Sequence, residues 1–223
     1  MIVLDDIKIS LNADLILKGQ GVRPDKADSG LYAEAEEALE ETREFIAPAA
    51  LFDIFKVKDY YHQTIELEDG GVFKGKLAVR TLAGAKEVAL GVCTIGADLE
   101  NLSEELFHRD PVKAMAYTGA GIAALRLTSE ALLAEIREKA ADRGWGSGMR
   151  AQPGQENWPI EQQQVIFDRL PVEKIGVKLT ESCLIIPKNS VSSVVGMGPD
   201  MHPDGIACDF CSKRKHCPWK IED

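Results

Sequence analysis

Residues 149–155 read MRAQPGQ, and residues 176–193 read GVKLTESCLIIPKNSVSS. The first stretch is typical of a ligand-binding loop, because Gly154 lets a ligand approach the backbone closely and Pro153 makes the backbone rigid. Arg150 adds a planar set of donors that can hold a carboxylate through two hydrogen bonds. An ordinary surface loop, and strand ends closed by side-chain-to-backbone bonds, would explain the same two stretches without a ligand.

Helices and strands are predicted outward from these stretches. Apolar residues at helical spacing predict helices over residues 31–47, 98–107, 111–142 and 159–170. The longest begins at Asp110-Pro111, a typical helix start, and is rich in alanine and glycine, so we expect another backbone to approach it closely. Alternating patterns and turn residues predict a strand-rich region over residues 52–94, with strands at 65–68, 72–82 and 87–95. Further strands are predicted over residues 177–179, 183–186 and 190–195. Because βαβ alternation is missing, the order indicates an α+β fold.

The order of four motifs resembles a known family. They are Arg-x-x-Pro-Gly at 150–154, Pro-x-x-x-Gln at 159–163, Gly-Val-Lys-Leu-Thr-Glu-Ser at 176–182 and Pro-x-x-Ser-Val-Ser at 187–192. The combination is similar to the activation domain of cobalamin-dependent methionine synthase, and more closely to stand-alone proteins related to that domain. The detailed match spans about residues 148–197. The resemblance implies a twisted, mainly antiparallel sheet with flanking helices.

The resemblance also implies a ligand and a role. The ligand would be S-adenosylmethionine in a shallow groove, and the role would be the reductive methylation that reactivates an oxidised cobalamin. An external reductant supplies the electron, and the protein positions the methyl donor against the cobalt of a partner's corrinoid. The chain would then be an accessory component of methionine synthase-type methyl transfer.

Individual residues carry over where the motifs match. Arg150 is expected to hold the ligand carboxylate, and Glu130 on the long helix to lie near its ammonium or sulfonium group. Main-chain groups of Ala151 and Gln152 are expected to bond to the ligand. The family often has tyrosine where this chain has Gln155, so an aromatic surface is missing here. The expected ligand-binding residues are Glu130, Arg150, Ala151, Gln152, Pro153, Gly154, Gln155, Glu181 and Ser182.

A partner protein is expected. The chain lacks the Asp-x-His-x-x-Gly pattern of a cobalamin-binding domain and leaves no room for one. A corrinoid-binding protein, or a methionine synthase lacking its own activation domain, would bring the cobalamin, and an electron donor would be a further partner. Two alternatives stay open: a methyltransferase that uses S-adenosylmethionine on another substrate, and a non-catalytic module that docks on a corrinoid protein. Gln155 in place of tyrosine favours the docking module.

A separate chemistry is predicted for residues 206–223, a cysteine-rich tail that follows a single α+β domain of residues 1–205. Cys208, Cys211 and Cys217 form a Cys-x2-Cys-x5-Cys pattern, and thiolates at this spacing can bind a metal. Candidate fourth ligands are Cys183, His202 and His216. An iron–sulfur cluster and zinc both suit these ligands, and a metal-free tail is the alternative.

Composition limits the remaining classes. The 223 residues are 45% hydrophobic and 28% charged, which is ordinary for a globular protein with a sizeable core. The net charge of −10 disfavours nucleic-acid binding, which depends on lysine and arginine neutralising phosphates. No secretory signal, no run of about 20 apolar residues and no P-loop or dinucleotide fingerprint is present. We therefore expect a cytoplasmic protein without a membrane partner, in which cysteines are thiols or metal ligands.

Overall fold

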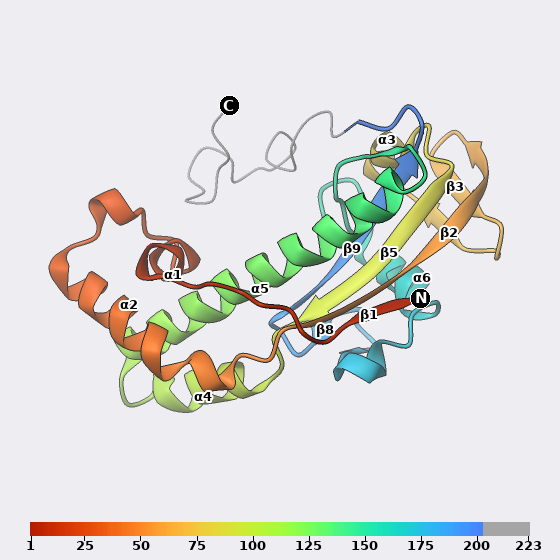
Figure 1. Ribbon diagram of the computed structural model, residues 1–223. Coiled ribbons are helices and arrows are strands. Elements are labelled where there is room, and N and C mark those ends of the chain that lie inside the picture. Colours follow the sequence, from red (N-terminus) through yellow and green to blue (C-terminus); the bar gives the residue numbers. More distant parts are fainter. Residues whose placement is uncertain (203–223) are drawn as a thin grey trace.

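The computed structural model describes residues 1–202. Its architecture is α+β, with a curled antiparallel sheet flanked by helices, as the sequence predicts (Figure 1). The main sheet has the strand order β4-β3-β2-β5-β9-β6, and β1 pairs with β2 beside this path, while β7 and β8 pair separately. The strands are β1 (Ile2–Leu4), β2 (Ala49–Tyr61), β3 (Thr64–Leu67), β4 (Val72–Lys74), β5 (Glu87–Thr94), β6 (Gly146–Ser147), β7 (Lys178–Leu179), β8 (Ile185–Ile186) and β9 (Ser190–Gly198).

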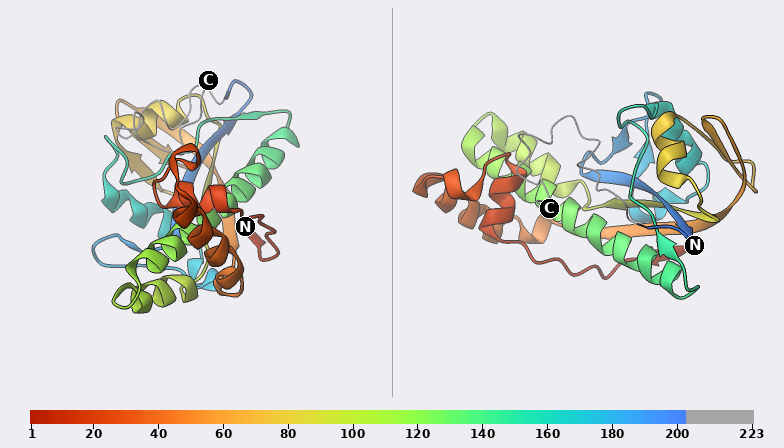
Figure 2. Two further views of the ribbon diagram at one scale, coloured as in Figure 1. Left: turned by 90° about the vertical axis from the view of Figure 1, so that its left-hand side faces the viewer. Right: turned by 90° about the horizontal axis from the view of Figure 1, so that it is seen from above.

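The helices divide between two ends of the molecule. They are α1 (Ala13–Gly19), α2 (Ser29–Glu41), α3 (Lys76–Leu82), α4 (Asp98–Phe107), α5 (Pro111–Ala141) and α6 (Gln163–Phe167). Figure 2 shows α1, α2 and α4 gathered around the first half of α5, whereas its second half lies along the sheet. Within residues 1–202, no helix has the length and apolar character needed to span a membrane.

Helix α5 begins where the sequence predicts. Asp110 Oδ1 accepts a hydrogen bond from the Lys113 N–H at 3.1 Å, and Pro111 occupies the first turn. The small residues of its first half meet α1, because a Cβ added to Gly19 would lie only 2.1 Å from the Gly119 carbonyl oxygen. The two backbones therefore touch where they cross, which confirms the expected close approach.

Apolar side chains cover both faces of the sheet. The face toward α5 buries Leu132 and Ile136 of that helix together with Phe52 of β2. The opposite face buries Trp158, whose ring meets Phe73 edge-on with ring centroids 5.6 Å apart. Alternate residues of β5 and β9 enter the two layers, because successive side chains of a strand point to opposite faces.

The strand predicted over residues 72–82 is wrong in its second half. Strand β4 ends at Lys74 and α3 follows. Gly75 has a φ of 143°, a conformation that favours glycine and ends the strand. The buried residues of α3 are then spaced helically, at Leu77, Ala78, Thr81 and Leu82. A short apolar run of this kind suits either a strand or a buried helix.

Other elements differ from the prediction mainly at their ends. The helix expected to reach residue 47 ends at Glu41 and continues as a 3-10 turn over Arg43–Phe45. The helix expected over 159–170 begins as a 3-10 turn at Ile160–Gln162 and becomes the short α6. Strand β1 and helix α1 occur in a region for which the sequence predicts no element. The expected boundary between residues 205 and 206 lies outside the described residues.

Candidate functional site

The Arg-x-x-Pro-Gly motif lies beside the edge of β9. Between the Ser147–Met197 pair and the Ala151–Val194 bridge, the edge segment has three residues and β9 has two. One extra residue on one side is the pattern of a β-bulge, which changes the face to which later side chains point. Ala151 therefore joins the layer opposite α5, and the preceding Arg150 points toward α5.

Arg150 is partly buried between this edge and α5. Its Nη1 donates a hydrogen bond to Ser129 Oγ at 2.5 Å, and Ser129 is a buried residue of α5. Burial lowers the pKa of Arg150, although arginine remains charged in proteins. Among residues 1–202, no carboxylate forms an ion pair with Arg150. The site therefore presents a positive charge held by a neutral hydroxyl.

The thiol of Cys93 completes the surroundings of Ser129. Cys93 belongs to β5 and is fully buried, and its thiol is within hydrogen-bonding reach of Ser129. Burial raises the pKa of Cys93 to about 12. The thiol thus keeps its proton at neutral pH and adds no negative charge beside Arg150.

Glu130 lies next to Ser129 on the exposed side of α5. Its Oε1 pairs with Arg126 Nε at 2.9 Å, one helical turn away. Both groups act on the charge of Arg150, since Arg126 lowers and Glu130 raises the pKa of that guanidinium. The structure thus brings Glu130 and Arg150, which the sequence predicts for one site, into the same neighbourhood.

Main-chain groups of Ala151 and Gln152 have partners inside the protein. The N–H and carbonyl of Ala151 bond to Val194 at 3.1 and 2.8 Å. The Gln152 N–H donates to Gln155 Oε1 at 2.9 Å, so the residue that replaces the family's tyrosine closes its own loop. The expected bonds from Ala151 and Gln152 to a ligand stay a prediction, and at the Gln152 N–H they require displacement of the Gln155 side chain.

Pro153 and Gly154 attach the loop to the segment that follows it. Pro153 is buried, and its carbonyl accepts a hydrogen bond from Gln163 Nε2 at 3.3 Å. Gly154 has a φ of 93°, in the region that favours glycine, and its N–H bonds to the Trp158 carbonyl at 2.9 Å. Their expected part in shaping a ligand groove stays a prediction.

Glu181 and Ser182 are exposed in the turn between β7 and β8. Ser182 Oγ lies 3.0 Å from Thr180 Oγ1, which also accepts the Leu184 N–H at 2.9 Å. These bonds close the turn, as hydroxyl side chains commonly do. In the described part of the chain, neither Glu181 nor Ser182 bonds to Arg150, and their role in a ligand site stays a prediction.

Comparison with known proteins identifies the fold. No family model and no curated protein matches the chain. A solved structure, the MetH reactivation domain bound to AdoHcy, matches it with a TM-score of 0.58 and 20% sequence identity. The chain has the fold of the MetH reactivation domain. The match covers 77% of this chain and 65% of that chain, so it spans less than two thirds of the MetH structure.

Ser129 is the part of this candidate site that the sequence does not predict. Its signal is faint, because Thr128 and Ser129 are two hydroxyl residues among the buried, mostly small or apolar positions of α5. The sequence also gives no sign that the bulge before Ala151 turns Arg150 toward this helix. The partner of Arg150 therefore emerges only from the tertiary structure.

The metal-binding prediction concerns mainly residues outside the described part. Cys208, Cys211, Cys217 and His216 lie beyond residue 202. Of the other candidate ligands, Cys183 is partly buried and His202 is exposed. Within residues 1–202, no group of three His, Cys, Asp or Glu side chains is arranged to hold a metal.

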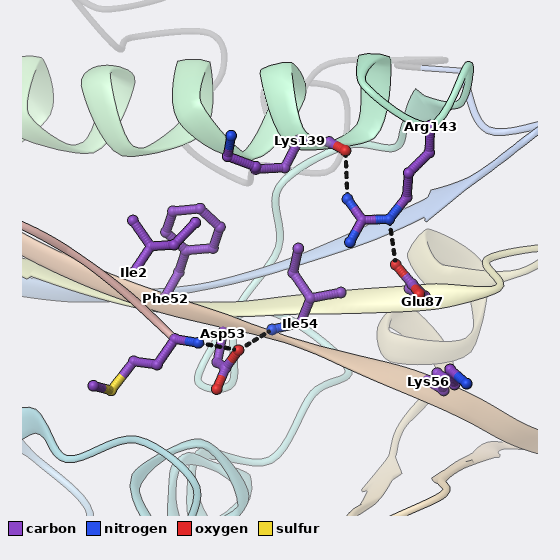
Figure 3. A pocket seen from close by; sticks show the side chains of 9 residues that line it. Ile2, Phe52, Asp53, Ile54, Lys56, Glu87, Lys139 and Arg143 are labelled. Atoms are coloured by element: carbon purple, nitrogen blue, oxygen red, sulfur yellow. Dashed lines mark hydrogen bonds and ion pairs between the residues drawn. The ribbon is translucent and has the colours of Figure 1, made fainter.

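A pocket of about 330 Å³ lies away from the Arg150 loop, between β1, β2 and the end of α5 (Figure 3). It is lined by Met1, Ile2, Phe52, Asp53, Ile54, Lys56, Glu87, Lys139 and Arg143. Two ion pairs join lining residues, the Met1 amino group with Asp53 at 2.8 Å and Arg143 with Glu87 at 3.3 Å. None of the predicted site residues lines this pocket.

Proposed function

We propose that the chain binds S-adenosylmethionine and acts as an accessory protein for reductive methylation of a corrinoid held by a partner. The observation that carries the proposal is Arg150, a partly buried guanidinium whose hydrogen-bond partner, Ser129, is neutral. A cation removed from water without a counter-charge is unfavourable. A ligand carboxylate would supply the missing charge, and arginine binds carboxylates through two parallel hydrogen bonds.

The fold supports this choice of ligand. The MetH reactivation domain that shares the fold is bound to AdoHcy. S-adenosylhomocysteine and S-adenosylmethionine both end in an amino acid, with a carboxylate and an ammonium group. Arg150 would hold the carboxylate and Glu130 would attract the ammonium, since the two side chains lie in one neighbourhood.

The chain would position the methyl donor against the corrinoid of its partner. S-adenosylmethionine supplies an electrophilic methyl group when it is bound. Arg150 and Glu130 would fix the amino-acid end of the ligand, which lowers the entropy cost of bringing donor and acceptor together. A corrinoid-binding protein, or a methionine synthase lacking its own activation domain, would present the acceptor, and an electron donor would reduce it.

A second candidate is a docking module that covers a corrinoid protein without binding S-adenosylmethionine. The loop favours it, because Gln155 closes the loop through the Gln152 N–H and supplies no aromatic surface. The main-chain N–H and carbonyl of Ala151 likewise already have hydrogen-bond partners in Val194. The partner class is the same in both proposals, and ligand binding separates them.

The cysteine tail adds a component to the proposal. Cys208, Cys211 and Cys217 would hold an iron–sulfur cluster or zinc, with Cys183, His202 or His216 as a fourth ligand. Thiolate ligands suit both metals. An iron–sulfur cluster would carry an electron for reductive methylation, whereas zinc would only stabilise the tail.

Calorimetric titration with S-adenosylmethionine tests the ligand. Arg150→Ala should weaken binding about tenfold or more, because hydrogen bonds to charged groups contribute about 1.5–3 kcal/mol. The affinity of Arg150→Lys should lie between those of the wild type and Arg150→Ala, since lysine keeps the charge but lacks the planar pair of donors. Arg137→Ala is the matched control, because it removes the same charge from an exposed position of α5 and should leave binding unchanged.

Saturable binding that weakens only at position 150 supports the accessory-protein proposal and directs the search to a corrinoid partner. Wild-type protein that binds no S-adenosylmethionine, with or without a corrinoid protein present, contradicts it and favours the docking module.

A further inference from the structure

We propose that Ser129 is a positioning residue that orients Arg150 while leaving its charge for the ligand, so that the site selects ligands with a free carboxylate. The inference rests on the proposed function. It assigns to Ser129 a part that the motifs of the loop do not indicate.

The geometry joins two distant parts of the chain. Ser129 lies on the buried side of α5, with 3% of its surface exposed, and Arg150 comes from the bulged segment beside β9. The 2.5 Å bond from Nη1 to Ser129 Oγ is the hydrogen bond that ties the guanidinium to the scaffold. It uses one of five N–H donors of the guanidinium, which leaves donors for a carboxylate.

The groups that face this bond from the sheet are neutral. Cys93 of β5 is opposite Val191 of β9, and Gly91 is opposite Ser193, so Cys93 and Ser193 point to the face that α5 covers. The Ser193 hydroxyl is buried and has no hydrogen-bond partner within residues 1–202. The sheet therefore supplies a thiol and a hydroxyl rather than a carboxylate.

The remaining charges near Arg150 come from α5 and offset each other. Arg126 and Glu130 act on Arg150 with opposite sign and form an ion pair at 2.9 Å. An anion at position 129 would be different, because it would lie in hydrogen-bond contact with the guanidinium. A hydroxyl there fixes the direction of Arg150 and does not neutralise it.

This arrangement predicts a specificity that can be measured with two ligands. S-adenosylhomocysteine carries the amino-acid carboxylate, whereas 5′-methylthioadenosine has the same nucleoside and sulfur but lacks that group. Wild-type protein should prefer S-adenosylhomocysteine. The preference should depend on Ser129 as well as on Arg150.

The test compares dissociation constants of both ligands for four proteins. Ser129→Ala should weaken S-adenosylhomocysteine binding about 3- to 10-fold, the range of one hydrogen bond, and leave 5′-methylthioadenosine unchanged. Ser129→Thr keeps the hydroxyl and should retain most of the wild-type preference for S-adenosylhomocysteine. Ser129→Asp should remove the preference even though it gives Arg150 a stronger partner and keeps or raises the melting temperature.

A double-mutant cycle separates positioning from general packing. In an Arg150→Ala background, Ser129→Ala should cause no further loss of S-adenosylhomocysteine affinity. An equal effect of Ser129→Ala on both ligands, or a full effect without Arg150, overturns the inference while the proposed function stands. Wild-type protein that binds neither ligand overturns both. Melting temperatures, measured in parallel, identify any variant that fails to fold, and Ser129→Thr then decides alone.

Discussion

At the scale of single residues, the pairing of Arg150 with Ser129 is central, because a guanidinium that bonds to a neutral hydroxyl keeps its full positive charge. Arg150 donates to Ser129 Oγ at 2.5 Å, burial lowers the pKa of the guanidinium, and no carboxylate of residues 1–202 forms an ion pair with it. The chain as a whole carries a net charge of −10, so the loop is a locally positive place on an acidic protein. Local fields of this kind attract small anions.

The stability of the protein at alkaline pH should depend on Cys93. Burial raises the pKa of this thiol from 9.0 to about 12, so the folded state keeps a proton that the unfolded chain releases above pH 9. The unfolded state then binds fewer protons, and the free energy of unfolding falls between pH 9 and 12 by at most about 1.4 kcal/mol per pH unit. This part of the pH dependence should be missing in Cys93→Ala.

Urea unfolding of wild-type protein and Cys93→Ala at pH 8 and pH 10 measures the difference. Tyr60 and Tyr117, whose pKa values are also raised to about 12, mainly by burial, titrate in both proteins and cancel. Parallel losses of stability in the two proteins would show that the thiol is not buried as described.

The sequence identifies Arg150 but not its partner. The loop motif names the arginine because arginine, proline and glycine occur together at 150–154. Ser129 is one hydroxyl on a helix, and its meeting with Arg150 depends on one extra residue between Ser147 and Ala151. Such a bulge leaves little trace in composition, because any of several residues can occupy it.

At the scale of elements, the crossing of α1 and α5 is the contact that small residues make possible. Gly19 and Gly119 face each other there, and a Cβ on Gly119 would lie 2.6 Å from the Ile16 carbonyl oxygen. Alanine is favoured over glycine in a helix by about 1 kcal/mol, so helix propensity and packing act in opposite directions at this position.

Gly119→Ala should therefore destabilise the protein by about 1–2 kcal/mol, because overpacking against a backbone exceeds the gain in helix propensity. Chemical denaturation followed by circular dichroism measures the change. Gly30→Ala is the control: its Cβ would meet only Asp28 Oδ1, at 3.2 Å, and we expect a change within about 0.5 kcal/mol. A Gly119→Ala variant as stable as wild type would contradict the described crossing.

Elements were predictable where their patterns are long. The 31 residues of α5 and the buried run of β5 have enough length for a clear period. Residues 76–82 do not, because seven residues with a buried face fit a strand or a helix equally well until Gly75 sets the boundary. Helix α1 also has seven residues, and a helix so short depends on its crossing with α5 rather than on its own propensity.

At the scale of the whole molecule, the second half was predictable in more detail than the first. The motifs at 150–192 indicate the activation-domain fold, and the match to the MetH reactivation domain confirms that fold. The sheet and the long helix place Arg150, Ser129 and Glu130 together, whereas α1 and α2 pack against the first half of α5 (Figure 1). The site therefore joins the loop that the motifs cover to Ser129 and Glu130 of α5, which the motifs do not cover.

The cysteine tail should make the full chain a metalloprotein. Protein purified without air should contain iron with acid-labile sulfide, or zinc, and Cys208→Ser and Cys211→Ser should each lower the metal content several-fold, since each removes one ligand. Cys93→Ala is the control, because Cys93 is buried in β5. Metal-free wild-type protein, or equal metal content in all variants, would contradict the prediction.

A crystal structure of the protein with S-adenosylhomocysteine would show directly whether Arg150 binds the carboxylate of the ligand. We expect that carboxylate to lie within hydrogen-bond distance of the Arg150 guanidinium, which should still contact Ser129. S-adenosylhomocysteine bound elsewhere, or Arg150 bonded to Ser129 alone with the ligand present, would contradict this expectation.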